Sequence, residues 1–187
     1  MSLRQRLIQA ALVVGLSGAA GTGALITSAE FIGNKEGERR EVYLDLGGVP
    51  TWCFGQTVGT YKARYTAQEC AEDLLRSTRQ YHTSVMRYLP QSAPESVQAA
   101  MTSLAYNVGM YGWQWELRGG KRVPSRFMPY IQRADWEGLC AAIEAPWVGR
   151  HGVAKGFKAT VQGRPVRGLE NRRAGEAKLC RRDLHVR

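Results

Sequence analysis

The stretch EGERREVYLDLGGVPTW, residues 36 to 52, begins with a glutamate, has an aspartate nine positions later and a threonine six positions after that. Strand-forming residues on both sides of Gly47-Gly48 predict two strands joined by a tight turn, a β-hairpin. Glu36 precedes this hairpin on a short expected helix, whereas Asp45 and Thr51 lie on its two adjacent strands. We therefore expect Asp45 and Thr51 to lie close enough to hold one water molecule together.

These three residue types suit the cleavage of a glycosidic bond. Such a reaction needs an acid that protonates the leaving oxygen and a second polar group that acts on the anomeric carbon or on its water. Glu36 would be the acid, and Asp45 with Thr51 would be the second group. The spacing alone is a weak signal, because surface carboxylates are common, so the rest of the chain has to support this interpretation.

Helical patterns dominate the rest of the chain and predict an α+β protein, mainly helical with a small β lobe near its N-terminus. Thr66 and Glu69 form a capping box before an amphipathic helix. We expect further helices to begin at caps formed by Ser92, Ser125 and Asp135, and a last helix to cover Glu170 to about Arg181. Residues 148 to 168, with five glycines and many basic residues, are expected to form a loop.

The chain of 187 residues has a formal net charge of +10, which predicts attraction to polyanions such as nucleic acid, anionic lipid or an acidic cell-wall polymer. One alternative to an enzyme is therefore a basic membrane-associated protein that binds nucleic acid or lipid without catalysis. The histidines, His82, His151 and His185, are far apart in the sequence. Without a paired motif they do not indicate a zinc site, and no metal is expected.

The first 29 residues differ from the rest of the chain. After Arg4 and Arg6, the segment LIQAALVVGLSGAAGTGALITSA, residues 7 to 29, carries no charge. As one helix it would extend about 34 Å, enough to cross the hydrocarbon layer of a membrane. Its many Gly and Ala residues make it weakly apolar. It is compatible with a cleaved signal peptide, a permanent anchor or a metastable span that later leaves the membrane.

The four cysteines, Cys53, Cys70, Cys140 and Cys180, all follow this segment. In an oxidising compartment they would form disulfides, and four cysteines allow three pairings. Buried free thiols are the other interpretation. The residues alone do not choose among these arrangements.

The pattern E-G-x-R-x-x-x-Y-x-D…T-x-x-x-G closely resembles the catalytic motif of phage-type lysozymes, glycoside hydrolase family 24. It is formed here by Glu36, Gly37, Arg39, Tyr43, Asp45, Thr51 and Gly55. The resemblance continues in YTAQECAEDLL, SLAYNVG, SRFMPYIQRADWEGLC and GLENRRAGEAKLC, and so covers nearly all of the chain after Glu30. It implies a lysozyme-like fold and a muramidase that needs no cofactor and hydrolyses the β-1,4 bond between N-acetylmuramic acid and N-acetylglucosamine in peptidoglycan.

The resemblance also assigns roles to residues. Glu36 would be the general acid of a usually inverting reaction, with Asp45 and Thr51 positioning the water or stabilising positive charge. Tyr106 and Asn107 match a stretch that lines the sugar cleft, and Ser125 matches a cap near it. The family often has Gly-x-Gly-His-Thr after the threonine, where this chain has Gln56 in place of histidine. The pairings Cys53–Cys70 and Cys140–Cys180 are favoured on the same basis.

Finally, the resemblance suggests how the enzyme is controlled. Some endolysins of this family carry an uncleaved signal-arrest-release segment, which implies a tethering segment at residues 1–29 and a catalytic domain at residues 30–187. The enzyme would be held inactive at the host inner membrane, facing the periplasm, and released into the periplasm after a holin or pinholin depolarises the membrane. The expected partners are peptidoglycan and, through residues 7–29, the membrane, with no nucleic acid and a monomeric chain. A lytic transglycosylase is the remaining enzymatic alternative.

Overall fold

The computed structural model describes residues 1–16, 21–45, 47–59 and 61–184. These residues are mostly helical and include small two-stranded antiparallel sheets, which confirms the predicted α+β class. The chain folds into two compact units, Met1–Gln80 and Tyr81–Arg187. The boundary between them falls within α3 (Ala67–Met86).

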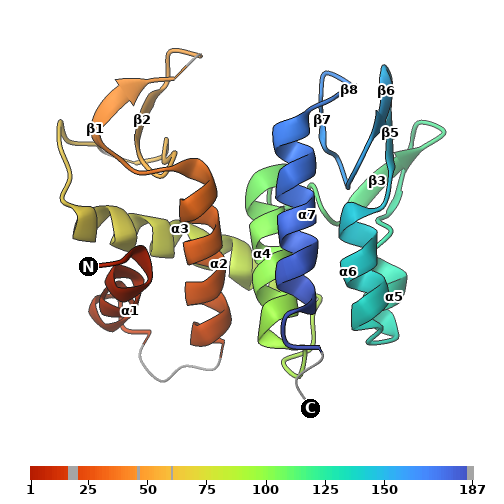
Figure 1. The fold of residues 1–187 in the computed structure, drawn as a ribbon, viewed down its shortest axis with the longest axis horizontal. Coiled ribbons are helices and arrows are strands. Elements are labelled where there is room, and N and C mark those ends of the chain that lie inside the picture. The colour runs from red at the N-terminus through yellow and green to blue at the C-terminus, as the bar shows by residue number, and fades with distance from the viewer. Residues whose placement is uncertain (17–20, 46, 60, 185–187) are drawn as a thin grey trace. The chain divides into compact units, whose positions relative to one another are not determined.

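The first unit is built around α2, the helix that ends at Glu36. Its elements before α3 are α1 (Leu3–Val13), α2 (Thr22–Glu36), β1 (Arg39–Leu44) and β2 (Pro50–Cys53). Figure 1 shows α1 beside α2, with α2 leading directly into the β1–β2 hairpin. At Gly33 a side chain would collide with Leu3 and Leu74 and crowd Phe54, so α1, α3 and the segment after β2 all pack closely on α2 at this point.

The predicted hairpin is confirmed. β1 and β2 are antiparallel, with Tyr43 opposite Thr51 and Leu44 opposite Pro50, and an irregularity in the register lies between Arg39 and Tyr43. Because directly opposed residues of an antiparallel pair share a face, Tyr43 lies on the same face as Thr51. Asp45 follows β1 by one residue, so the expectation that it lies on a strand was wrong by one position, whereas Thr51 lies on β2 as expected.

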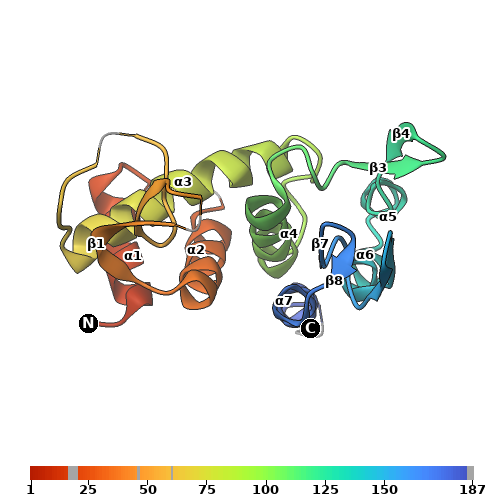
Figure 2. The same ribbon diagram turned by 90° about the horizontal axis from the view of Figure 1, so that it is seen from above.

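The second unit is a helical bundle with short hairpins. Its elements after α3 are α4 (Glu95–Val108), β3 (Trp115–Arg118), β4 (Lys121–Pro124), α5 (Met128–Gln132), α6 (Trp136–Glu144), β5 (Trp147–Gly149), β6 (Gly152–Ala154), β7 (Thr160–Val161), β8 (Arg164–Pro165) and α7 (Arg167–Arg181). Figures 1 and 2 both show α7 between α4 and α6. The core between these helices includes fully buried Met101, Leu104, Trp113, Phe127 and Phe157.

The prediction of a loop over residues 148 to 168 was wrong. This stretch contributes to two short hairpins, β5–β6 and β7–β8, which pack against each other through the hydrogen bond from His151 N to Gly163 O. Glycines at the turns made the stretch resemble a loop, yet Gly152 and Gly163 adopt positive φ, which tight reversals between strands require. The β3–β4 hairpin was also not predicted.

Two of the four predicted helix caps were confirmed. Glu69 N donates to Thr66 Oγ1 at 3.1 Å, and Thr66 N donates to Glu69 Oε2 at 2.7 Å, while Gly138 N donates to Asp135 Oδ1 at 2.9 Å. Ser92 is not a cap, because the chain remains extended at Pro94 and α4 begins at Glu95. Ser125 is not a cap either: α5 begins at Met128, and the Ser125 hydroxyl accepts no hydrogen bond from the described residues.

Both disulfides favoured by the family resemblance are present, Cys53–Cys70 in the first unit and Cys140–Cys180 in the second. The weakly apolar segment of residues 7 to 29 is divided between α1, α2 and residues 17–20, which lie outside the described residues. Within the described part of the chain, no helix is both long and apolar enough to cross a membrane.

Candidate active site

Glu36 occupies the last position of α2, one helical turn after Gly33. Gly37 ends the helix with φ 77°, a conformation that favours glycine, and its N–H donates to Gly33 O at 3.0 Å. The Glu36 side chain is exposed and extends toward the segment that follows β2: a Cβ atom added at Gly55 would lie 4.0 Å from Glu36 Oε2. The carboxylate therefore sits beside the turn at Gly55.

Asp45 lies where β1 ends and its carboxylate shapes the hairpin turn. Oδ1 accepts hydrogen bonds from Gly47 N at 2.8 Å and from Val49 N at 2.9 Å. Among the described residues both of these bonds go to Oδ1, so Oδ2 remains available to a water or a substrate. Asp45 is exposed, so its carboxylate can hold the turn through Oδ1 and also contact a water or a substrate through Oδ2.

Thr51 lies on β2 and is 3% exposed. Its hydroxyl donates to Val49 O at 3.0 Å, which fixes the orientation of the hydroxyl group and leaves its oxygen able to accept a hydrogen bond. Val49 connects the two residues, because its N–H donates to the Asp45 carboxylate and its C=O accepts from the Thr51 hydroxyl. The hairpin turn holds the two predicted water-positioning residues in one hydrogen-bonded unit.

The segment after β2 is a tight turn that places Gly55 next to Glu36. Trp52 N donates to Gln56 O and Gln56 N donates to Trp52 O, both at 3.0 Å, while Cys53 and Gly55 have positive φ values of 53° and 83°. The Gln56 side chain closes the turn, because its Oε1 accepts from Phe54 N at 2.8 Å. Gln56 therefore has a structural role in this turn that the sequence did not reveal.

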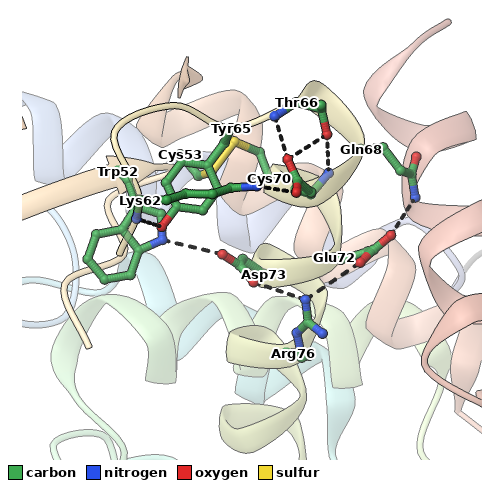
Figure 3. Close-up of polar contacts among 11 residues, drawn as sticks. Trp52, Cys53, Lys62, Tyr65, Thr66, Gln68, Cys70, Glu72, Asp73 and Arg76 are labelled. Atoms are coloured by element: carbon green, nitrogen blue, oxygen red, sulfur yellow. Dashed lines mark hydrogen bonds and ion pairs between the residues drawn. A yellow bond between two sulfur atoms is a disulfide. The ribbon is translucent and has the colours of Figure 1, made fainter. Parts of the chain in front are cut away.

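A polar network fixes this turn to α3 (Figure 3). Trp52 Nε1 donates to Asp73 Oδ2 at 3.3 Å, Asp73 Oδ1 pairs with Arg76 at 3.0 Å, and the Cys53–Cys70 disulfide makes a covalent link to the same helix. Trp52 also stacks on Tyr65, with ring planes 3° apart. The turn beside Glu36 is therefore held at several points rather than by its backbone alone.

The other predicted site residues lie in the second unit. Tyr106 and Asn107 are in the last turn of α4, where the Tyr106 ring packs on Tyr81 with centroids 5.0 Å apart. Ser125 is 1% exposed, its N–H donates to Gln114 O at 2.8 Å, and its hydroxyl has no hydrogen-bond partner in the part of the chain that the structure describes.

Asn107 belongs to a buried polar cluster that sequence reasoning missed. Its Oδ1 accepts a hydrogen bond from Arg173, and Arg173 forms an ion pair with Glu176 on the same helix, α7. Ser103 Oγ on α4 also donates to Glu176, at 2.7 Å. Burial lowers the pKa of the Arg173 guanidinium, and the charge of Glu176 opposes that shift. The only signal in the sequence was the charged stretch NRRAGE, which by itself suggested a solvated helix face.

Comparison with known proteins decides the family. The model of the phage lysozyme family matches residues 33–176. The chain belongs to the phage lysozyme family. It is similar to the SAR-endolysin of Escherichia phage P1, with 30% identity over 81% of this chain and 77% of the relative, and to that of Pseudomonas phage phiKMV, with 28% identity over 78% and 80%.

The solved structures agree with this assignment to the phage lysozymes. The active form of P1 phage endolysin Lyz superimposes with a TM-score of 0.77 and 26% identity, over 98% of this chain and 96% of that one. As a phage lysozyme the chain is a glycoside hydrolase, so the alternative of a non-catalytic basic binding protein is rejected. The comparisons concern the family and the fold, and they assign no role to an individual residue.

Proposed function

We propose that this enzyme is a muramidase in which Glu36 is the general acid and Asp45 and Thr51 hold the attacking water. The observation that carries the proposal is the arrangement around the β1–β2 hairpin. Glu36 ends α2 beside Gly55, and the same hairpin links Asp45 and Thr51 through Val49. A carboxyl group and a separate water-binding pair are the two groups that glycosidic hydrolysis needs.

In this mechanism Glu36 donates its proton to the glycosidic oxygen as the bond to the anomeric carbon breaks. A water bound between Asp45 Oδ2 and the Thr51 hydroxyl oxygen attacks the anomeric carbon from the opposite face and gives its proton to Asp45. The sugar leaves with inverted configuration and a free reducing end. Preorganisation of the pair by the Val49 backbone lowers the entropic cost of placing that water.

The products distinguish this mechanism from its alternatives. Digestion of purified peptidoglycan should give fragments that end in reducing N-acetylmuramic acid, and proton NMR during the first turnovers should show the inverted anomer. A 1,6-anhydro product in mass spectra would instead identify a lytic transglycosylase. A retained anomer would indicate a covalent intermediate and would contradict the water-positioning role of Asp45.

We further propose that Tyr106, Asn107 and Ser125 of the second unit contribute to sugar binding. In support, the Asn107 carbonyl oxygen is already engaged by Arg173, which orients the amide and leaves its NH2 group as the donor. Changing Asn107 to alanine should raise KM more than it lowers kcat, since a binding group acts in the ground state as well as in the transition state.

Membrane tethering followed by release is the third part of the proposal. Residues 7–29 carry no charge and would hold the chain at the host inner membrane, facing the periplasm, until a holin or pinholin depolarises that membrane. The described parts of this segment, residues 7–16 and 21–29, pack into the first unit, with Leu7, Ala10 and Ala24 fully buried. The similarity of nearly the whole chain to the active form of the P1 endolysin supports this conformation as the released one.

Mass analysis of the periplasmic protein during lysis tests the release. An intact N-terminus, beginning at Met1 or Ser2, is expected. A mature chain that starts at Glu30 would instead indicate cleavage by signal peptidase and would remove the tethering proposal without affecting the assignment of the catalytic residues.

A further inference from the structure

Arg6 makes a set of contacts that its position near the N-terminus does not suggest. Its Nη2 donates to Glu38 Oε2 at 2.8 Å, and its Nη1 donates to Ala67 O at 2.9 Å. The Arg6 side chain is only 13% exposed and that of Glu38 is 23% exposed. This ion pair is therefore screened by solvent much less than the surface pairs on the same unit.

The partners of Arg6 adjoin the proposed catalytic acid. Glu38 is separated from Glu36 by Gly37 alone, and glycine offers little resistance to a change of backbone direction. The last turn of a helix is also where fraying begins. When Arg6 holds Glu38, the direction in which the chain leaves α2 is fixed. The last turn of α2, which carries the Glu36 side chain, is then restrained as well.

The other end of this contact is the first turn of α3. Ala67 is its first residue, and Cys70, three residues later, holds the turn beside Gly55 through the disulfide to Cys53. Figure 3 shows that disulfide reaching the first turn of α3. Arg6 and the disulfide thus attach the two segments on either side of the Glu36 carboxylate to one rigid helical turn.

We infer that Arg6 is a positioning residue for catalysis: through Glu38 and Ala67 it holds Glu36 in its working position. The inference rests on the proposed role of Glu36 as the acid. It has a consequence for control, because Arg6 precedes the uncharged segment. While residues 7–29 span the membrane, Arg6 is on the opposite side from Glu38, about 34 Å away, and the contact forms only after release.

Arg4 provides a matched control on the same helix. Its Nη1 pairs with Glu30 Oε2 at 2.7 Å, yet its side chain is 49% exposed and Glu30 lies in the middle of α2 rather than at its end. Arg4→Ala and Arg6→Ala remove the same chemical group from the same helix. Only the second change removes a contact beside the catalytic acid.

The experiment uses the full chain, because residues 1–29 supply buried side chains to the first unit. The kcat and KM of purified variants are measured on soluble, uncrosslinked peptidoglycan strands, at a temperature where circular dichroism shows every variant folded. Arg6→Ala should lower kcat about tenfold and leave KM within about twofold, whereas Arg4→Ala should change neither by more than about twofold. A merely structural role would lower the thermal midpoint without lowering kcat of the folded enzyme.

Rescue gives a second, independent readout. Arg6→Glu should be more damaging than Arg6→Ala, and combining it with Glu38→Arg should recover at least about threefold of the lost kcat, since the ion pair is restored in the opposite sense. If Arg6→Ala does not fold, Arg6→Lys takes its place. Lysine keeps the charge but has only one side-chain nitrogen, so it cannot bond Glu38 and Ala67 as the two arginine nitrogens do, and kcat should fall severalfold.

The two ways to fail are distinct. If Glu36→Gln is inactive while the Arg6 variants match Arg4→Ala in kcat, the positioning role of Arg6 is wrong and the role of Glu36 stands. If Glu36→Gln keeps wild-type activity, the acid assignment is wrong and the inference about Arg6 falls with it.

Discussion

Glu36 is the residue on which the proposed chemistry depends most. Glu36→Gln keeps the shape of the side chain but removes the proton donor, so kcat should fall roughly 10²- to 10⁴-fold, enough to abolish lysis. The thermal midpoint should stay near that of wild type because the side chain is exposed. Glu41→Gln is the matched control, since Glu41 is an exposed glutamate on β1 that forms a long, solvent-exposed pair with Arg64 at 3.8 Å. Equal activity of the two variants would remove Glu36 from the mechanism.

Asp45 combines two functions that different substitutions separate. Asp45→Asn retains an Oδ1 that accepts from Gly47 N and Val49 N, so the hairpin should keep its stability while kcat drops strongly. Asp45→Ala loses these bonds as well and should also lower the free energy of unfolding by about 1 kcal/mol. Kinetics and urea unfolding of both variants test this. An active Asp45→Asn enzyme would show that the charge on Asp45 is not needed.

At the scale of single elements, the start of α3 should impart a pH dependence to stability. Hydrogen bonding from Lys62, followed by that from the Thr66 N–H and hydroxyl, lowers the pKa of Glu69 from 4.5 to about 2. A carboxylate with a lowered folded-state pKa stabilises the fold above its unfolded pKa and loses that contribution as pH falls through the folded value. The contribution should therefore disappear between pH 4.5 and pH 2.

Comparison of wild type with Glu69→Gln by thermal unfolding between pH 7 and pH 2 tests this. Wild type should be more stable at pH 7, and the two midpoints should converge as the pH falls toward 2. Added salt should shrink the difference only partly, because it screens the pair with Lys62 but leaves the Thr66 hydrogen bonds. A difference that is constant with pH would contradict the assigned titration.

The Cys140–Cys180 disulfide joins α6 to α7 and should be the stronger of the two cross-links. Its two cysteines are 40 residues apart in the sequence, whereas Cys53 and Cys70 are 17 residues apart. In the chain-entropy account these separations correspond to about 4 and about 3 kcal/mol. Replacing each pair by alanines and measuring urea unfolding should give that order. A larger loss of unfolding free energy on removing the Cys53–Cys70 pair would show that chain entropy is not the main contribution of these bonds to stability.

The elements that sequence predicted well are those in which local chemistry is sufficient. Gly47-Gly48 between strand-forming residues specified the hairpin, and Thr66 with Glu69 specified the start of α3, because the interacting groups lie within a few residues of each other. The same local rule failed at Ser125, whose buried hydroxyl bonds no group in the described part of the chain, because a tertiary contact of its N–H with Gln114 O places it three residues before α5.

The rest depends on contacts between segments that are distant in the sequence. No local signal indicates that Arg173 meets Asn107, or that Arg6 meets Ala67, since these pairs are separated by 66 and 61 residues. The proposed catalytic roles came from family resemblance rather than from spacing. Gln56 illustrates the limit of that resemblance, because the motif marked it only as a missing histidine, whereas the structure shows it closing the turn at Phe54.

At the scale of the whole molecule, charge is unevenly distributed. Residues 1–80 contain 9 basic and 8 acidic residues, whereas residues 81–187 contain 17 basic and 8 acidic ones. Nearly all of the net positive charge thus belongs to the second unit. Such a charge attracts the acidic polymer that the enzyme digests and accelerates the encounter with it, most strongly at low ionic strength.

The proposed release of the N-terminal segment is also a property of the whole molecule. Gln9 is exposed on α1, so Gln9→Leu should leave the packed form intact while making the uncharged segment more apolar. Leucine favours insertion by a few tenths of a kcal/mol and the polar amide no longer opposes it. The variant should remain longer in the membrane fraction and lyse later, with unchanged activity once purified.

Gln91→Leu, an exposed change of the same kind outside the segment, is the control for this experiment. It should leave both fractionation and lysis time unchanged. If Gln9→Leu and Gln91→Leu lyse at the same time and fractionate alike, the apolarity of residues 7–29 does not set the moment of release.

Both disulfides together use all four cysteines of the chain, so the folded protein presents no thiol to a maleimide reagent. A cysteine introduced at Leu12, which is 62% exposed on α1, would therefore be the only reactive handle in the molecule. A polarity-sensitive fluorophore attached there would emit from hydrocarbon while the segment is inserted and from water after it has left. The oxidised state of the natural cysteines would thus make the proposed passage of this enzyme out of the membrane optically observable in single cells, in real time.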